Sequence, residues 1–342
     1  MTKAWEKTSG TSTAKGASVL FFNFHWSFTI MEPSGKGWPL PGTPALYASI
    51  IAGFATITLS ISSVRAEETT ICLRGIENSI FYMLQENQRR YYKDFTGVGN
   101  TLNANHPVGR EFVTSVLRYW VMHTHVDGFR FDLASVLGRD EHGNILRDAP
   151  LLEGIAEDPI LRDVKIIAEA WDTGGAYQVG DFSTKRWTEW NGRFRDDVRR
   201  FWVGDAGMIG SFASRICGSS DLYQSSGKGP ASSLNFVTCH DGFTLNDLVS
   251  YKQKHNNENG EFNRDGTDAN YSDNCGVEWP GDDPVVEGMR NRLIKNFLLT
   301  LFISRGVPML LGGDEFRRTQ RGTALKFVEL VIFSRSSWKR WE

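Results

Sequence analysis

Apolar residues follow two different spacings along the middle of the chain. Short stretches are apolar or alternate with a period of two, which is typical of strands, whereas longer stretches repeat their apolar residues at helix spacing. The first kind predicts strands at residues 126–133, 164–171, 233–242 and 307–315. The second kind predicts helices at residues 110–123, 151–163, 191–204 and 288–304. Strands separated by helices indicate βαβ units, and therefore an α/β protein with a parallel sheet.

The predicted strand at residues 126–133 carries charge on one of its two faces. Phe129 and Phe131 alternate with Arg130 and Asp132, so the two phenylalanines share a face that fits beneath a layer of helices. The other face places a guanidinium group beside a carboxylate. Such a pair on the inner face of a strand needs an explanation, because a buried ion pair stabilises a fold only weakly.

Ionisable residues also end the other predicted strands: Glu169, His240 with Asp241, and Asp314 with Glu315. A single acidic residue at a strand end usually caps the next helix, and this interpretation stays open for the last pair. The repetition at successive strand ends instead favours the C-terminal face of a (β/α)8 TIM barrel, where such enzymes keep their active sites. We therefore expect an α/β fold of the TIM-barrel type.

The composition is that of a globular protein whose net charge is too small to attract nucleic acid or a membrane surface. The chain has 342 residues, of which 40% are hydrophobic and 12% aromatic, so it contains enough apolar material for a sizeable core. The formal net charge of −2 gives no long-range attraction to nucleic acid or to an anionic membrane. Each of the eleven tryptophans is explained first by core packing, although indole rings also stack on sugars.

The cysteine and histidine positions show no spacing typical of a metal site. The four cysteines lie far apart and form no C-x-x-C pair: Cys72, Cys217, Cys239 and Cys275. We therefore expect buried free thiols and a reducing compartment, the cytoplasm or, in a plant, the plastid. His123 and His125 would share one face of a strand, but no third ligand lies near them in the sequence. We expect no metal.

Both ends of the chain differ from its middle. Residues 1–70 and 323–342 lack a steady period, and we leave the first unassigned and treat the second as an atypical tail. Residues 37–63 contain no charge, and the Val-x-Ala that follows resembles a signal-peptidase site. This stretch starts late for a signal sequence and lacks a compact basic start. A membrane or secretory segment at residues 37–66 is therefore the alternative interpretation, and a membrane association is not what we expect.

Three explanations compete for the clustered charges. A structural ion pair explains Arg130 and Asp132 but not Glu169 or Asp241. A divalent cation would bind the carboxylates, but the fixed positive charge of an arginine among the ligands opposes it. Glycoside hydrolysis needs one ionised and one protonated carboxyl group. Arg130 would keep Asp132 ionised, and an apolar setting beside Ile167 would raise the pKa of Glu169. We therefore favour the hydrolase.

Several stretches carry a family resemblance. "DGFRFDLAS", "IIAEAWDTGG" and "VTCHDGFT" resemble the second, third and fourth conserved regions of the alpha-amylase superfamily, glycoside hydrolase family 13. "RGIENSIFYML", "EWNGRFRDDVRRFW" and "GVPMLLGGDEFRRTQRG" further resemble isoamylases and glycogen-debranching enzymes. The resemblance runs from about residue 74 to residue 322, and its motifs are highly specific.

The resemblance implies a role for each of these charged residues. Asp132 is then the nucleophile, Glu169 the general acid and base, and Asp241 the stabiliser of the transition state. Arg130 is the partner of the nucleophile, and His240 binds a sugar hydroxyl. The implied reaction is the retaining hydrolysis of α-1,6 branch linkages in glycogen, amylopectin or limit dextrins, and it needs no cofactor.

The chain also departs from the family pattern. The first conserved region has no counterpart before "RGIEN", and the family's later sequence does not continue after "RTQRG". We expect an incomplete barrel at residues 71–322 in which strands four to eight are recognisable. An open half barrel would expose strand edges and lack one wall of the sugar site. Two functions therefore stay open, a debranching hydrolase and a non-catalytic glucan-binding subunit of the isoamylase type.

Overall fold

The computed structural model describes residues 47–49, 73–257, 262–278, 280–281 and 283–324. The described strands form one parallel sheet of six strands in the order β1-β2-β3-β4-β5-β6. Their bounds are β1 Tyr47–Ser49, β2 Gly128–Phe131, β3 Lys165–Ala168, β4 Thr188–Trp190, β5 Ser233–Phe236 and β6 Val307–Met309. Because neighbouring strands follow one another in the sequence, the sheet is wound in one direction and brings all its C-terminal ends to one edge.

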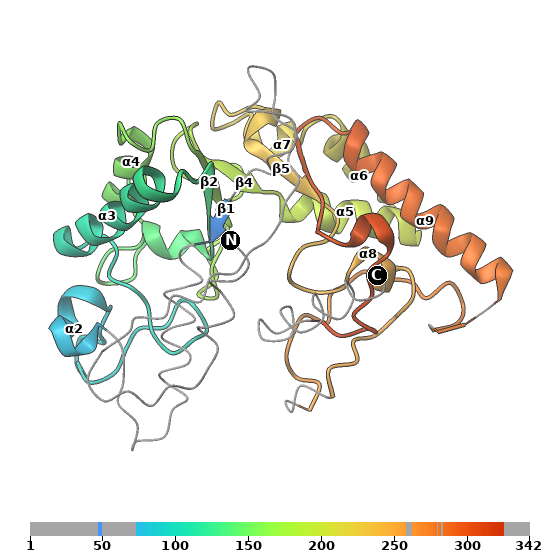
Figure 1. Cartoon of the computed structure of the whole chain (residues 1–342), viewed down its shortest axis with the longest axis horizontal. Helices are drawn as coiled ribbons and strands as arrows, with labels where there is room; N and C mark the ends of the chain where they lie inside the picture. Colours follow the sequence, from blue (N-terminus) through green and yellow to red (C-terminus); the bar gives the residue numbers. More distant parts are fainter. Residues whose placement is uncertain (1–46, 50–72, 258–261, 279, 282, 325–342) are drawn as a thin grey trace.

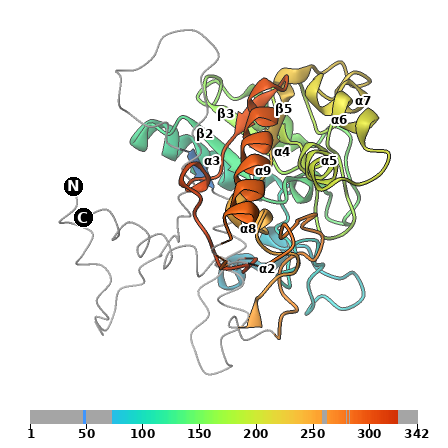
Figure 2. The same ribbon diagram turned by 90° about the vertical axis from the view of Figure 1, so that its right-hand side faces the viewer.

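Helices flank this sheet on both sides of the view in Figure 1. The α-helices are α2 Arg74–Phe81, α3 Pro107–Thr124, α4 Pro150–Glu157, α5 Gly192–Val203, α6 Ile209–Ile216, α7 Ser220–Tyr223, α8 Leu245–Leu248 and α9 Pro284–Ile303. The short 3-10 helices are η2 Ala134–Gly138, η3 Pro230–Ser232 and η5 Asp314–Phe316. Helices α3 and α4 lie to one side of the strands and α5, α6 and α9 to the other, and α9 runs along the outside of the molecule (Figures 1 and 2).

Side-chain caps fix the starts of the three longest helices. His106 accepts a hydrogen bond from the N–H of the second helical residue of α3, Asn191 caps α5 through Phe194, and Asp283 caps α9. Each cap satisfies a backbone donor that the first turn of a helix leaves free. The Asn191 side chain also donates to the hydroxyl groups of Ser219 and Ser233, which ties the start of α5 to β5.

The two faces of the sheet are buried by different partners. Phe129 and Phe131 of β2 are fully buried in a core that α3 and α4 complete. The opposite face contributes a smaller cluster that includes Ile167, Trp190 and Phe236. The alternation predicted for residues 126–133 is therefore confirmed. Burial of each phenylalanine contributes roughly 1.5–3 kcal/mol, so the outer face anchors the strand that carries Arg130 on its inner face.

The predicted strands and helices are present, and the strands are shorter than predicted. Two strands were missed. Strand β4 has only three residues, too few for an alternating pattern to stand out. Strand β1 pairs in parallel with β2, although we expected no strand so early in the chain. It is also only three residues long and lies within a stretch without strand-type alternation.

Two smaller expectations need comment. His123 and His125 are not on a strand, because α3 continues to Thr124 and His125 ends it in a left-handed conformation. Cys239 and Cys275 are buried free thiols as expected, but Cys217 is exposed, and Cys72 lies outside the described residues.

The membrane question concerns a stretch that is mostly not described. Apart from β1, residues 37–66 lie outside the described residues. Within the described part of the chain, no helix has both the length and the apolar character needed to cross a membrane.

Candidate active site

Arg130 joins the ends of β2 and β3. Its Nη1 lies 2.5 Å from Oδ1 of Asp132, and its Nη2 lies 2.9 Å from Oε2 of Glu169. All three side chains are largely buried. One guanidinium group therefore holds two carboxyl groups from neighbouring strands, where the sequence had indicated only the contact within residues 126–133.

Trp190 of β4 is the aromatic residue that contacts this charged group. The Trp190 ring lies 4.2 Å from the Arg130 guanidinium carbon, as a cation–π contact, and its edge faces His240 at 5.7 Å between ring centroids. A cation over an indole face is attracted by the ring quadrupole, which adds to the ion pairs in fixing Arg130. We did not single out Trp190 from the sequence. The signal available was its place two residues before "GRFRDD", directly before the predicted helix at 191–204.

The environment of Glu169 favours its protonated form. Burial raises the pKa of Glu169 to about 8, and the nearby Asp132 charge acts in the same direction, against the opposing influence of Arg130. The N–H of Leu133 donates to Oε2 of Glu169 at 2.8 Å, which fixes the carboxyl group against the end of β2. The rise expected from the apolar setting is confirmed in direction, so this group keeps its proton at neutral pH.

Asp132 has the opposite behaviour. Burial alone would raise its pKa, but the charge of Arg130, together with smaller contributions from His240 and a hydrogen bond with Glu169, outweighs burial. The pKa of Asp132 therefore lies below its ordinary value of 3.8. The expectation that Arg130 keeps this carboxylate ionised is confirmed in direction. Two adjacent carboxyl groups thus differ in protonation state: one is protonated, as a general acid must be, and the other is ionised, as a nucleophile must be.

The end of β5 contributes a more open group. Asp241 is 56% exposed, and one of its carboxylate oxygens lies 3.5 Å from Nε2 of His240. His240 is partly buried, and this burial lowers its pKa, so the imidazole is neutral at neutral pH. Coulombic interactions link both residues to Arg130. The structure therefore brings all five residues singled out in the sequence into one cluster.

The last acidic pair, Asp314 and Glu315, lies outside this cluster. Asp314 is buried, and it accepts hydrogen bonds from the Thr238 hydroxyl and from the N–H of Leu245, the first residue of α8. Burial raises its pKa to about 6. Glu315 accepts from the N–H of Gly313. Asp314 thus accepts from a free backbone N–H at the start of a helix, as the capping interpretation allowed. The helix is α8, however, and not the one that follows Asp314 in the sequence.

One group of potential metal ligands does occur among the described residues. Ligand atoms of Cys239, His240 and Asp241 lie within 4.8 Å of one another. The Cys239 thiol donates to the carbonyl oxygen of Asp241, however, and burial raises its pKa to about 11. The positive charge of Arg130 is also close enough to interact with this thiol. Metal coordination would require a thiolate in a place that favours the thiol, so these residues do not fit a resident cation.

Sequence comparisons find isoamylases and glycogen-related proteins among the relatives of this chain. No protein-family model matches it. It is 52% identical over 273 residues to a glycogen operon protein GlgX homolog of Mycobacterium tuberculosis, covering 80% of this chain and 37% of that protein. It is 50% identical to the chloroplastic isoamylase 3 of Oryza sativa subsp. japonica, over 79% of this chain and 34% of the relative. A glycogen debranching enzyme of Klebsiella pneumoniae is 47% identical, over 86% and 44%.

Solved structures with the same fold are pullulanases. The pullulanase of Anoxybacillus sp. LM18-11 in complex with maltotriose has a TM-score of 0.52 and 25% identity, and the match covers 76% of this chain and 34% of that one. A pullulanase from Bacillus acidopullulyticus gives a TM-score of 0.52 with 24% identity, over 71% and 27%. The fold predicted from the sequence, a (β/α)8 barrel present in part, is confirmed.

The chain spans less than half the length of the curated relatives it matches. The three matches cover 79% to 86% of this chain. The resemblance to isoamylases and glycogen-debranching enzymes is therefore confirmed by comparison: over about four fifths of its length, this chain is 47% to 50% identical to proteins with these names.

Proposed function

We propose that this chain carries the catalytic machinery of a glycoside hydrolase that cleaves α-1,6 branch linkages with retention of configuration. The observation that supports the proposal most strongly is the bridge of Arg130 between Asp132 and Glu169, two carboxyl groups of opposite protonation state. Retaining enzymes need their two carboxyl groups close together, about 5–5.5 Å apart, whereas inverting enzymes leave space for a water molecule. A shared guanidinium group and a mutual hydrogen bond favour the close arrangement.

Each step of the proposed reaction uses one of these groups. The Asp132 carboxylate attacks the anomeric carbon, while protonated Glu169 gives its proton to the oxygen of the scissile linkage, which leaves with the outgoing chain as a hydroxyl group. The result is a glycosyl ester on Asp132 and an ionised Glu169. Glu169 then takes a proton from water, whose oxygen attacks the anomeric carbon and releases Asp132 as the carboxylate.

Asp241 and His240 complete the site in this proposal. The exposed carboxylate of Asp241 is placed to accept hydrogen bonds from sugar hydroxyl groups, and these bonds strengthen as positive charge develops on the ring. A neutral His240 retains both a donor and an acceptor nitrogen for the same purpose. Arg130 acts on the sugar indirectly, by keeping Asp132 ionised and by fixing the angle between the two carboxyl groups.

The names of the relatives support a proposal for the substrate and for the compartment. We propose branched α-glucans as substrates, namely glycogen, amylopectin or limit dextrins, because relatives are named as an isoamylase and a glycogen debranching enzyme. We propose residues 71–322 as the catalytic unit. The cytoplasm is the compartment we propose, or the plastid in a plant, since one relative is named as chloroplastic.

The test is the release of reducing ends from amylopectin by the purified chain. We expect activity that is lost in Glu169→Gln, which keeps the shape of the side chain but has no proton to give. Linear amylose serves as the control substrate, because it carries almost no branch linkages. A folded chain that binds amylopectin without cleaving it would instead support the glucan-binding subunit and contradict the proposed hydrolysis.

A further inference from the structure

Arg199 of α5 is a buried cation without a carboxylate beside it. Only 2% of the residue is exposed, and within the described part of the chain its guanidinium group forms no ion pair with a carboxylate, although the charges of Asp196 and Asp314 act on it from farther away. Its Nε donates to the carbonyl oxygen of Val237 at 2.8 Å, and its Nη1 donates to the carbonyl oxygen of Asn270 at 3.0 Å. Among the residues that the structure describes, its Nη2 has no hydrogen-bond partner.

Such an arrangement is costly for the folded state. A buried guanidinium group without a counter-ion loses its hydration and recovers only part of that loss from neutral carbonyl groups. Burial lowers the pKa of Arg199 to about 10. Another fully buried arginine, Arg290, forms an ion pair with Glu287 at 2.8 Å. The unusual environment of Arg199 therefore raises the question of what its two carbonyl contacts achieve.

The two carbonyl contacts connect Arg199 to both ends of the segment that carries His240 and Asp241, directly at one end and through Asn270 at the other. Val237 directly follows β5 and begins this segment. At its far end, the N–H of Phe243 donates to Oδ1 of Asn270 at 3.3 Å, so Asn270 is bound both to Arg199 and to the end of the segment. The Asn270 side chain is itself fixed by its donation to the carbonyl oxygen of Thr267 at 2.9 Å. Residues 237–243 are thus held at both ends by one connected set of hydrogen bonds.

The turn inside the segment fits closely against Asn270. Gly242 has a φ of +80°, and a Cβ atom at this position would lie 2.8 Å from Oδ1 of Asn270. A side chain here would meet both backbone strain and a steric clash. The glycine therefore lets the backbone pass close to Asn270, immediately after Asp241.

Asp241 depends on this backbone for its position. Its carboxylate is 56% exposed, and within the described residues its one ion pair is the 3.5 Å contact with His240. Asp132 and Glu169, by contrast, are fixed directly by a shared arginine. We propose that Arg199 is a positioning residue that sets the location of Asp241 by bracing both ends of residues 237–243. The catalytic consequence of this inference rests on the proposed function. The bracing of residues 237–243 by Arg199 does not depend on it.

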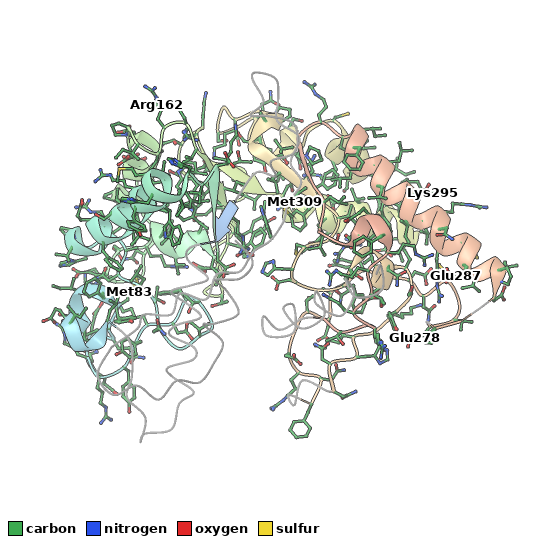
Figure 3. The ribbon with its side chains drawn as sticks, in the orientation of Figure 1. Met83, Arg162, Glu278, Glu287, Lys295 and Met309 are labelled. Carbon is green, nitrogen blue, oxygen red and sulfur yellow. The ribbon has the colours of Figure 1, made fainter. Side chains whose placement is uncertain are left out.

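The experiment compares Arg199→Lys with a matched control, Arg290→Lys. A lysine keeps the charge but cannot donate to two carbonyl groups in the geometry of a guanidinium group. Arg290 suits the control because it is equally buried and also donates to two backbone carbonyl oxygens, of Asn274 and Val277. Its partner Glu287 lies at the far end of α9, well apart from Met309 of β6 in Figure 3.

Two measurements are made on each full-length variant. Amide hydrogen exchange reports the bracing: we expect exchange in residues 237–243 to rise roughly tenfold in Arg199→Lys and to stay unchanged in Arg290→Lys. Debranching kinetics report the positioning: we expect kcat in Arg199→Lys to fall up to about 10²-fold with little change in KM, which is the effect of a misplacement of about 1 Å. Asn270→Ala keeps its carbonyl group for Arg199 but frees the N–H of Phe243, and should show the same pattern more weakly.

The outcomes separate the two claims. Unchanged exchange at residues 237–243 in both Arg199→Lys and Asn270→Ala overturns the bracing. Raised exchange with an unchanged kcat overturns the positioning role and leaves Arg199 as a structural residue. A wild-type chain without debranching activity contradicts the proposed function, and the exchange comparison then still decides whether Arg199 braces the segment. If Arg199→Lys does not fold, Asn270→Ala carries both measurements.

Discussion

The two sides of the charged cluster are built differently. At the ends of β2 and β3, Asp132 and Glu169 are buried and both bind the same guanidinium group of Arg130. At the end of β5, Asp241 is exposed and takes its position from the backbone on either side of it. In the proposed reaction, the nucleophile and the proton donor thus lie in a rigid, low-dielectric setting. The proposed transition-state stabiliser, Asp241, remains open to solvent, where a sugar can reach it.

The largest effect on stability should come from breaking the buried side of this comparison. Arg130→Met removes the shared cation and leaves two buried carboxyl groups without it, so we expect the free energy of unfolding to fall by about 3–5 kcal/mol. Urea unfolding measures the change. Arg162→Met is the matched control, because Arg162 is exposed (Figure 3), and its ion pair with Asp163 contributes little. A loss no larger than that of the control would contradict the assignment.

The protonation of Glu169 should appear in the pH dependence of the chain. The pKa of Glu169 is raised to about 8 in the folded state, so the acid is available below this pH and is lost above it. We expect kcat/KM to fall about tenfold per pH unit above pH 8. The folded state also holds a proton that the unfolded state releases near the ordinary glutamate pKa of 4.5. Stability from this group is therefore complete below about pH 4.5 and falls by up to about 1.4 kcal/mol per unit as pH rises toward 8.

A matched variant isolates this contribution. Glu169→Gln has no titrating group at this position, and we expect its unfolding free energy to change less steeply between pH 5 and pH 8 than that of the wild type. Identical slopes in the two proteins would mean that Glu169 is already ionised in this range.

A smaller effect should follow from the contact between Thr238 and Asp314. Thr238→Val removes the hydroxyl donor and leaves a buried carboxyl oxygen without it, so we expect a loss of about 1–3 kcal/mol in thermal or urea unfolding. The pKa of Asp314 should rise further above about 6, because the hydroxyl group stabilises its anion. An unchanged stability would show that Leu245 alone is enough to hold Asp314.

The smallest effect on stability should come from the exposed side of the comparison. Asp241→Asn alters a mostly exposed group, so we expect the unfolding free energy to change by no more than about 0.5 kcal/mol. The same substitution should lower kcat roughly 10²–10³-fold, because it removes charge that stabilises the transition state. Asp132→Asn should instead affect both quantities, since Asp132 is a buried partner of Arg130. Equal stability losses in the two variants would contradict the difference between the two sides.

The sequence predicted the contacts around Arg130 better than the contacts that hold the backbone near Asp241. Arg130 and Asp132 lie two residues apart on one strand, so a local period was enough to pair them. The contact of Arg130 with Glu169 joins two strands and depends on their register, which pairs Arg130 with Ile167. Arg199 and Asn270 are 71 residues apart, and no local pattern connects them. Trp190 was missed for a related reason, because a three-residue strand is too short to show its period.

The same distinction holds for the fold. The long amphipathic stretches predicted α3, α5 and α9, because several turns of a helix repeat their apolar spacing. Strand β1 could not be predicted in this way, since its pairing with β2 is a tertiary contact of three residues. The winding of the strands into one sheet followed from their alternation with helices, which leaves few ways to connect parallel strands.

The most direct measurement is a carbon-13 NMR titration of the carboxyl groups in the full chain, with Glu169→Gln to assign the signal. We predict one carboxyl signal with a pKa near 8, which is absent from the Glu169→Gln spectrum. We predict a second signal, assigned with Asp132→Asn, whose pKa lies below the ordinary aspartate value of 3.8. A Glu169 signal that titrates near the ordinary glutamate value of 4.5 would contradict the division of these two carboxyl groups into an acid and a nucleophile.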